Sequence, residues 1–437
     1  MNSDLPKVLH PLGNVPLVVH AMASGDVVEP ERVVVIAGHG ADAVEPKVLA
    51  YNPDAVVVRQ TEQLGTGHAV LQAREALADF EGDAIVVFGD TPFVRPDTIA
   101  KMVASRADGN AIVMLGFEAA DPGRYGRMIA VGNDLEAIVE AKDASPSQLD
   151  ITLCNSGLVV ADAQMLFDLL QGIGNDNASG EYYLTDIVAA ARAQGHSASV
   201  VTCDEAETMG INTRAELAHA EQLFQSQKRA EALENGATLT APDTVFFSFD
   251  THIGRDALIE PNVVFGPSVT IESGATIRAF SHLEGCHVSR GAVVGPYARL
   301  RPGAELAENT KVGNFVEVKN ANILEGAKVS HLSYIGDATI GARANIGAGT
   351  ITCNYDGYMK HHTEVGEDAF IGSNTMLVAP VSIGIQAMTA SGSVINKNVP
   401  NGALALGRAP QVTKLGMALK LFDKLKKTKA RRAKEAK

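Results

Sequence analysis

Two basic residues, one histidine and one tyrosine lie close together in the second half of the sequence and could act on a phosphorylated substrate. Arg301 and Lys319 are eighteen residues apart, His331 follows, and Tyr334 lies three residues later. A phosphate would offset repulsion between two stacked cations, and a histidine can exchange a proton near neutral pH. The alternatives are a solvent-facing ladder for the two cations and a structural role for the histidine.

An aliphatic residue returns at every sixth position through residues 253–395, beginning with Ile253 and Ile259, and this repeat must position the four side chains. A period of six suits neither a helix nor an ordinary strand, so it predicts a parallel β-helix whose rung has three short sides. Because a rung takes about eighteen residues, Arg301 and Lys319 should lie one above the other on the same side.

The six-residue period is lost at residues 347–362 and returns at Val365. Such an interruption predicts a loop that leaves the coil, where ligand and subunit contacts are often placed. His361 and His362 lie in it, and without a third ligand we expect no metal site there.

The first half alternates short β-branched runs with helix-like segments at residues 67–79 and 96–106. The runs are residues 33–36, 55–58, 84–88 and 111–117. This alternation predicts an α/β unit, a mostly parallel sheet with helices on both faces, and such sheets bind ligands at the carboxyl ends of their strands.

Polar and glycine-rich residues follow several of these runs. Asp90 comes after the run at 84–88 and could hold a divalent cation, or it could be a turn residue before a proline. Residues 63–68 (QLGTGH) open a helix with glycines and could approach a base or phosphate. Residues 124–127 and 155–157 are expected to be ordinary turns.

Length and composition predict four segments within 437 residues. They are an α/β domain at 1–214, a linker helix at 215–235, the β-helix at 236–423 and a basic tail at 424–437. The tail is expected to be disordered, with binding of an anionic partner as the alternative.

The net charge of −14 argues against a nucleic-acid partner. The absence of an eighteen-residue apolar run argues against a membrane partner. Four scattered cysteines suggest the reducing cytoplasm rather than disulfides or zinc.

Four long strings, at residues 3–10, 63–69, 180–186 and 347–357, resemble the bacterial family of bifunctional N-acetylglucosamine-1-phosphate uridyltransferases/glucosamine-1-phosphate acetyltransferases. The resemblance covers nearly the whole sequence. It implies a Rossmann-like nucleotidyltransferase domain followed by a left-handed β-helix, assembled as a homotrimer with acetyltransfer sites between subunits. The implied substrates are glucosamine 1-phosphate, acetyl-CoA and UTP, and the implied metal is Mg²⁺.

The resemblance also implies roles for particular residues. In the α/β domain it places Mg²⁺ on Asp90 and Asn212. The nucleotide-sugar contacts that it implies are Lys7, Gln60, Gly65, Thr66, Gly126, Glu140, Asn155 and Asn212. In the β-helix it implies His331 as the base, Arg301 and Lys319 on the substrate phosphate, and Tyr334 and Asn345 on the sugar. The implied acetyl-CoA contacts are Ala348, Asn354, Tyr355, Ser373, Ser391 and Arg408, with Ser391 replacing the family's usual alanine.

One departure concerns the start of the sequence. The family opens with an apolar strand and a glycine-rich phosphate loop, and Met1 stands where the last residue of that loop is expected. We therefore expect that the sequence as given was started at an internal codon and that the cellular protein has about twenty more residues. Without them, two strand edges should lack partners and uridyltransfer should be weak, because donors to the triphosphate are lost.

Three rival functions remain open from the sequence. The chain could be an acetyltransferase only, with the first domain as a scaffold. It could be a nucleotidyltransferase for another sugar, with the β-helix serving only for trimerisation. It could also bind a nucleotide sugar without turnover. An assay of acetyl-CoA consumption with glucosamine 1-phosphate distinguishes the first two, whereas the third predicts binding without product.

Overall fold

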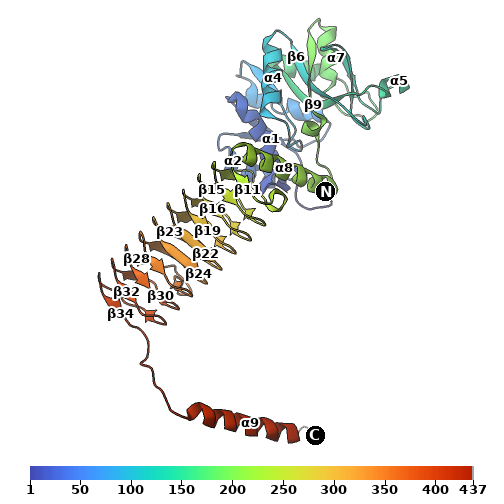
Figure 1. Cartoon of the computed structure of the whole chain (residues 1–437). Helices are drawn as coiled ribbons and strands as arrows, with labels where there is room; N and C mark the ends of the chain where they lie inside the picture. Colours follow the sequence, from blue (N-terminus) through green and yellow to red (C-terminus); the bar gives the residue numbers. More distant parts are fainter. Residues whose placement is uncertain (436–437) are drawn as a thin grey trace. The chain divides into compact units, whose positions relative to one another are not determined.

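The computed structural model describes residues 1–435, which form two compact units (Figure 1). The first unit comprises Met1–Glu231 with Phe247–Phe249, and the second comprises Ala232–Phe246 with Asp250–Lys437. The finer four-part division of the sequence remains a prediction.

The first unit contains two sheets besides the small hairpin of β1 (Pro11–Leu12) and β2 (Val15–Pro16). Strands β3 (Val34–Ala37) and β4 (Val56–Arg59) pair in parallel as a sheet of their own. The larger sheet has the order β5-β9-β6-β10-β8-β7. Its strands are β5 (Asp83–Val86), β6 (Ile112–Glu118), β7 (Arg127–Val131), β8 (Asp134–Val139), β9 (Leu153–Asp162) and β10 (Ala198–Cys203).

Strands β3 and β5 each have an unpaired edge. Among the described strands, β3 pairs only with β4, and β5 pairs only with β9.

The prediction of a mostly parallel sheet is wrong for the six-stranded sheet. Of its described pairs only β6–β10 is parallel, because β9 runs antiparallel between β5 and β6. The β7–β8 hairpin reverses the chain, so β9 can return beside β6 without a crossover helix. Residues 155–157, which we expected to form a turn, lie inside β9.

Helices cover both faces of the six-stranded sheet. Ile99 of α4 packs with Val113 of β6 on one face, whereas Leu166 of α6 packs with Ile112 on the other. The helices of this unit are α1 (Leu17–Gly25), α2 (Ala41–Tyr51), α3 (Thr66–Leu71), α4 (Pro96–Ala107), α5 (Pro146–Leu149), α6 (Ala163–Gly172), α7 (Asp186–Ala193) and α8 (Arg214–Glu234). Short 3-10 turns are η1 (Lys7–Leu9), η2 (Asp26–Val28), η3 (Glu75–Leu77) and η4 (Glu205–Thr208).

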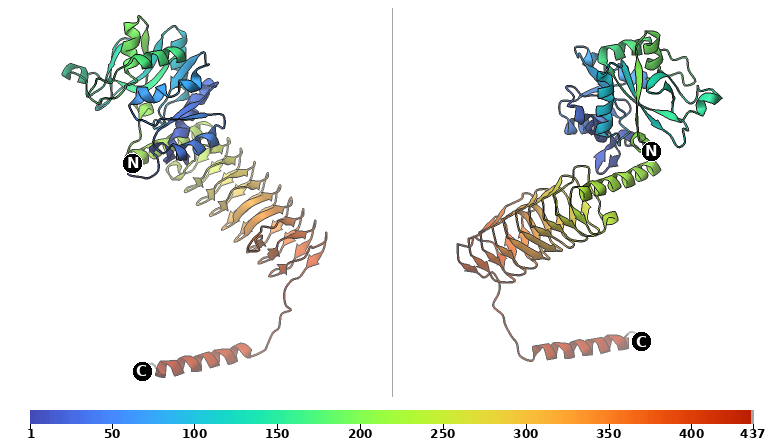
Figure 2. Two further views of the ribbon diagram at one scale, coloured as in Figure 1. Left: turned by 180° about the vertical axis from the view of Figure 1, so that it is seen from behind. Right: turned by 45° about the horizontal axis from the view of Figure 1, so that its top comes forward.

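The second unit is a parallel β-helix, whose stacked rungs are visible in both views of Figure 2. It includes one short 3-10 turn among its described residues, η5 (Pro242–Thr244), which follows its first strand. One sheet contains β11 (Thr238–Leu239), β13 (Leu258–Ile259), β16 (Thr276–Ile277), β19 (Val293–Val294), β22 (Lys311–Asn314), β24 (Lys328–His331), β26 (Asn345–Ile346), β29 (Phe370–Ile371), β32 (Met388–Thr389) and β34 (Leu404–Ala405).

The other strands of the coil run along its remaining sides. They are β12 (His252–Ile253), β14 (Val264–Phe265), β15 (Val269–Ile271), β17 (His282–Leu283), β18 (Cys286–Val288), β20 (Arg299–Leu300), β21 (Ala304–Leu306), β23 (Glu317–Ile323), β25 (Tyr334–Ile340), β27 (Ile351–Cys353), β28 (Thr363–Val365), β30 (Met376–Val378), β31 (Val381–Ile383) and β33 (Val394–Ile395).

The sixth-position residues point into the coil, as their period predicts. Ile259, Ile277 and Val294 are fully buried and lie in register on successive strands. Rungs approach closely at the corners: a Cβ added to Gly347 would lie 2.6 Å from the carbonyl oxygen of Ile371. Small residues at these corners therefore permit the stacking.

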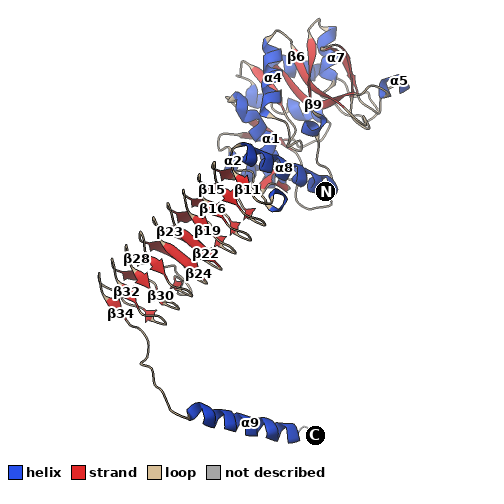
Figure 3. Cartoon of the chain, in the orientation of Figure 1, coloured by secondary structure: helices blue, strands red, loops and turns tan. Residues whose placement is uncertain are grey.

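The C-terminal segment corrects one prediction. Instead of a disordered tail, the structure has helix α9 (Met417–Glu435), drawn blue in Figure 3. Residues 417–435 contain neither glycine nor proline and are rich in alanine, leucine, lysine and arginine, which are good helix formers. The last two residues of the predicted tail, 436 and 437, lie outside the described part. No helix within residues 1–435 is long and apolar enough to cross a membrane.

Candidate functional site

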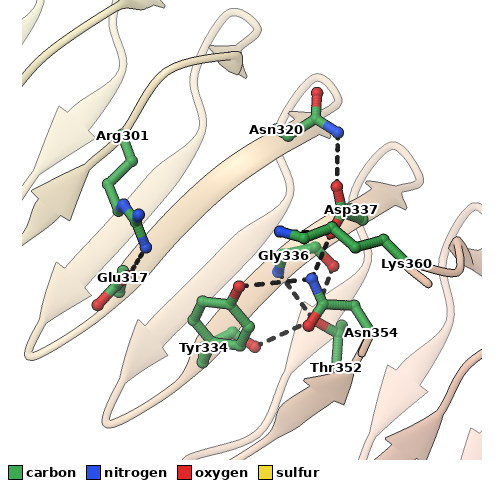
Figure 4. A network of polar contacts seen from close by, with 9 residues as sticks. All are labelled: Arg301, Glu317, Asn320, Tyr334, Gly336, Asp337, Thr352, Asn354 and Lys360. Atoms are coloured by element: carbon green, nitrogen blue, oxygen red, sulfur yellow. Dashed lines mark hydrogen bonds and ion pairs between the residues drawn. The ribbon is translucent and has the colours of Figure 1, made fainter. Parts of the chain in front are cut away.

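Strand register brings Arg301 and Lys319 together on the β-helix. Leu300 pairs with Val318, and the Arg301 amide donates to the Val318 carbonyl at 2.9 Å. The eighteen-residue spacing therefore predicts the stacking correctly. The Arg301 guanidinium also donates to Oε1 of Glu317 at 2.8 Å (Figure 4), a partner that the sequence argument did not include.

The loop that interrupts the repeat adds a third cation, Lys360. A β-bridge between Tyr355 and Lys360 folds the loop back on itself. Lys360 then lies beside Lys319, and contact with this second ammonium group lowers the pKa of Lys319. Sequence reasoning missed Lys360 because the period on which rung positions depend is lost in this loop.

Buried Asp337 contacts two asparagines and lies close to Lys360 (Figure 4). Its carboxylate accepts from Asn320 at 2.6 Å and from Asn354, and the Lys360 ammonium lies 3.9 Å away. Burial acts to raise the pKa of Asp337, but the two amide hydrogen bonds and the nearby ammonium groups hold the pKa below its usual value. The Asn354 amide also donates to the Tyr334 hydroxyl at 3.4 Å, so Asn354 helps to position that ring.

His331 lies at the end of β24, and its side chain is exposed. Asn345 begins the neighbouring strand β26, and Tyr334 begins β25. An open groove of about 430 Å³ adjoins this region and includes Tyr334, Glu317 and Ser333 in its lining. Within residues 1–435 no side-chain hydrogen bond of the structure holds the His331 ring, which leaves it accessible to a ligand.

Four of the six implied acetyl-CoA residues form a row along one corner of successive rungs. The Ala348 carbonyl accepts a hydrogen bond from the backbone amide of Asn374 at 2.6 Å. The Ser373 carbonyl accepts one from the backbone amide of Gly392, on the next rung, at 2.8 Å. The Ser391 carbonyl accepts from the Arg408 guanidinium at 2.8 Å. Because Ser391 makes this contact through its backbone, serine in place of alanine leaves it intact.

The other two acetyl-CoA candidates, Asn354 and Tyr355, lie in the loop. Asn354 is buried and bonded to Asp337, whereas Tyr355 is exposed and donates to the Gly357 carbonyl at 2.5 Å. His361 bonds Asp356 at 2.7 Å in the same loop, consistent with its interpretation as a loop residue.

In the first unit, Lys7 joins Asp90 to Asn212. Its ammonium lies 2.5 Å from Oδ2 of Asp90 and 3.0 Å from Oδ1 of Asn212. These two oxygens converge on one cation, at the place where the sequence predicts a divalent ion. One carboxylate and one amide oxygen suit Mg²⁺, which usually takes its other ligands from water and substrate phosphates. No cluster of three or more His, Cys, Asp or Glu residues within 1–435 offers a complete protein cage.

The glycine-rich string at 63–68 is held by a second segment. The Leu64 carbonyl accepts from the Tyr182 amide at 2.8 Å, and a Cβ on Gly65 would lie 2.6 Å from the Tyr182 carbonyl oxygen. Gly65 also has a φ of +117°, so a side chain is disfavoured there on both grounds. Thr66 accepts from a backbone amide at 3.0 Å, and Gln60 bonds the ring of His68 at 3.0 Å.

Three of the residues implied as nucleotide-sugar contacts, Gly126, Glu140 and Asn155, form one cluster. The backbone amide of Asn155 donates to the Gly126 carbonyl at 2.8 Å, and a Cβ on Gly126 would lie 3.2 Å from Oε1 of Glu140. Thr185 donates to Glu140 at 3.1 Å. Burial raises the pKa of Glu140, although the Thr185 hydrogen bond acts in the opposite direction. A half-buried carboxylate here can accept hydrogen bonds from ligand hydroxyls.

Comparisons with known proteins cover both units. The family model described as MobA-like NTP transferase domain matches residues 1–148, and that of the bacterial transferase hexapeptide (six repeats) matches residues 250–285. Proteins named "Bifunctional protein GlmU" are similar along the whole chain. The relative from Jannaschia sp. (strain CCS1) is 63% identical over 435 residues, covering 100% of this chain and 96% of the relative. The relative from Paracoccus denitrificans (strain Pd 1222) is 62% identical over 429 residues, covering 98% and 96%.

Proposed function

Because this chain belongs to the family of bifunctional GlmU proteins, we propose how its two units divide the two reactions of that family. The chain is a glucosamine-1-phosphate acetyltransferase and an N-acetylglucosamine-1-phosphate uridyltransferase. Its Rossmann-like unit precedes a left-handed β-helix. The β-helix acetylates glucosamine 1-phosphate with acetyl-CoA, and the first unit then transfers UMP from UTP to the product.

The cation cluster of Arg301, Lys319 and Lys360 carries the acetyltransferase proposal. Lys319 and Lys360 are adjacent, and a dianionic sugar phosphate between such groups would offset their repulsion. A phosphate bound there leaves the sugar near Tyr334 and the amine toward His331. His331 takes a proton from the substrate ammonium, and the free amine attacks the thioester carbonyl. The C–S bond breaks, and the CoA thiolate leaves and takes up a proton.

The uridyltransferase proposal rests on the convergence of Asp90 and Asn212. These residues would hold Mg²⁺, which offsets charge on the phosphates when it is bound. Lys7 and the cluster of Gly126, Glu140 and Asn155 would orient the sugar phosphate. An oxygen of N-acetylglucosamine 1-phosphate attacks the α-phosphorus of UTP, and pyrophosphate leaves. The residues of the chain contribute mainly by positioning the two substrates.

A homotrimer is the proposed assembly, and an exposed apolar ladder on the β-helix supports it. Phe280, Tyr297 and Phe315 stack on successive rungs, with ring centroids 4.9 and 5.3 Å apart, and Leu332 follows. Each is 47–60% exposed and has a left-handed backbone with φ of 56–60°, which large side chains rarely adopt. A stacked row of exposed apolar side chains is typical of an interface. The four free cysteines support a reducing, cytoplasmic environment.

Steady-state assays test the acetyltransferase assignment. Replacing His331 by alanine should lower turnover about 10²- to 10⁴-fold with little change in substrate binding, because a base acts in the transition state. His252→Ala, at an exposed histidine of the first rungs, is the matched control and should keep parental turnover. Turnover of His331→Ala within threefold of the parent would exclude the assignment.

Separate measurement of acetyl-CoA consumption and pyrophosphate release tests the bifunctional proposal. Acetyl-CoA consumption without pyrophosphate release would favour an acetyltransferase only. Pyrophosphate release alone would favour a nucleotidyltransferase whose β-helix only assembles the chains. Binding without either product would favour a nucleotide-sugar binding protein. Equal use of glucosamine without phosphate would contradict the role of the cation cluster.

A further inference from the structure

Helix α9 (Met417–Glu435) combines an apolar face with a strongly basic end. None of its residues is buried. It carries eight lysines and arginines against Asp423 and Glu435, a net charge of +6 in a chain whose total is −14. The remainder of the chain is therefore at −20, and α9 is a concentrated positive segment on an acidic protein. Neither proposed reaction uses any residue of this helix.

Helical geometry separates the apolar residues from most of the charges. At about 100° per residue, Met417, Leu421 and Leu425 lie within one arc that also includes Phe422. These four side chains are 43–62% exposed. Leu419 lies about 60° beyond Phe422, at the edge of this arc. The face is apolar only in the first half of the helix, because residues 426–435 contain no large apolar side chain.

The second half of α9 is almost purely cationic. Lys426, Lys427 and Lys429 are followed by Arg431, Arg432 and Lys434. An apolar anchor followed directly by a polybasic segment provides the two contributions that hold a helix at an anionic bilayer surface. A nucleic acid would engage the charges but leave the apolar arc in water. An acidic protein surface could attract the same charges, and a change in the mass of the lipid-free assembly would distinguish it from a bilayer.

The segment before α9 gives the helix freedom to reach such a surface. Residues 409–416, which follow the last contact of Arg408 with the coil, contain no helix or strand and can extend to about 26 Å. We propose that α9 binds the surface of an anionic phospholipid bilayer, with its apolar arc among the lipids and its basic end on the headgroups. Our sequence-based expectation of no membrane partner rested on the lack of a spanning segment, and a helix lying in the interface needs none.

Sedimentation of the full chain with lipid vesicles tests the proposal. We expect binding to vesicles of phosphatidylcholine mixed with phosphatidylglycerol, weakening as salt is added, and little binding to phosphatidylcholine alone. The variant Leu421→Gln/Phe422→Gln/Leu425→Gln should bind at least about tenfold more weakly, since it removes three apolar anchors. Lys426→Gln/Lys427→Gln/Lys429→Gln should weaken binding at least about tenfold as well.

Leu419→Gln is the single-residue comparison, because Leu419 lies at the edge of the arc. It should weaken binding much less than the triple apolar variant, and all three variants should keep the parental acetyltransferase rate. Failure of the parent to bind, equal binding to uncharged vesicles, or unchanged binding by the triple apolar variant would overturn the proposal. If the parent does not bind and the triple variant changes the mass of the lipid-free assembly, α9 contacts another protein surface instead.

Discussion

Lys7 occupies the place between Asp90 and Asn212 that a divalent cation would take, so it should compete with metal. Its ammonium lies 2.5 Å and 3.0 Å from the two oxygens. Replacing Lys7 by alanine removes the competitor and leaves both ligands in place. Metal affinity in the absence of nucleotide should therefore rise, while uridyltransfer should fall because Lys7 is also proposed to position the sugar phosphate.

The size of the effect follows from the exposure of the pair. The Lys7 side chain is 40% exposed and that of Asp90 is 22% exposed. An exposed ion pair contributes about 0.2–1 kcal/mol, and a charged hydrogen bond away from water contributes about 1.5–3 kcal/mol. A partly exposed pair should fall between these ranges, at about 1–2 kcal/mol. Each 1.36 kcal/mol is about tenfold, so the Kd for metal should fall about 5- to 30-fold.

Titration with Mg²⁺ by calorimetry, or with Mn²⁺ by electron paramagnetic resonance, measures this affinity without turnover. Lys7→Arg keeps a cation and should resemble the parent, and Asp90→Ala should abolish binding. Lys142→Ala is the matched control, since Lys142 donates a hydrogen bond to Ser179 at 3.0 Å and contacts neither Asp90 nor Asn212 among the described residues. An unchanged or higher Kd for metal in Lys7→Ala would refute the competition. Lys7 would then only hold Asp90 and Asn212 in place.

Three further predictions concern the β-helix. Lys360→Gln should raise KM for glucosamine 1-phosphate about tenfold and spare KM for acetyl-CoA in steady-state assays, because one charged phosphate contact is lost; an unchanged KM would remove Lys360 from the site. Tyr297→Asn with Phe315→Asn should lower the assembly mass measured by light scattering while the chain keeps the circular-dichroism spectrum of the parent, because asparagine tolerates a left-handed backbone; retention of the trimer mass would contradict the interface. The backbone amides of Met359 and Tyr358 and the His361 ring bond the Asp356 carboxylate and lower its pKa from the usual 3.8. The carboxylate should therefore stabilise the loop fully above pH 3.8, and this stabilisation should be lost as the pH falls through the lower pKa of the folded state. Asp356→Asn should therefore reduce hydrogen-exchange protection of the loop at neutral pH, and equal protection in the variant would count against this role.

Part of the candidate site could be predicted because the β-helix repeats. Leu300 and Val318 are paired, so the position of Lys319 relative to Arg301 follows from counting one rung. Proton transfer by His331 could be predicted in the same way, because the repeat places His331 near Tyr334 and the two cations. The resemblance to a family added residue roles that no spacing could supply.

Other expectations failed where local patterns were ambiguous. Residues 155–157 have turn-like types but belong to β9, because pairing with β6 outweighs local preference. The basic tail has the composition of an exposed segment, yet helix formers dominate residues 417–435 and α9 results.

The sequence by itself determined the β-helix, its inward residues and the stacking of Arg301 on Lys319, since a constant rung length converts sequence distance into spatial position. The tertiary structure alone decided which groups meet outside the repeat. Lys7 is 83 residues from Asp90 and 205 from Asn212, and Lys360 reaches Lys319 only through a folded loop. These contacts join segment ends and loops, whose positions depend on long-range packing of whole elements and leave no periodic signal along the chain.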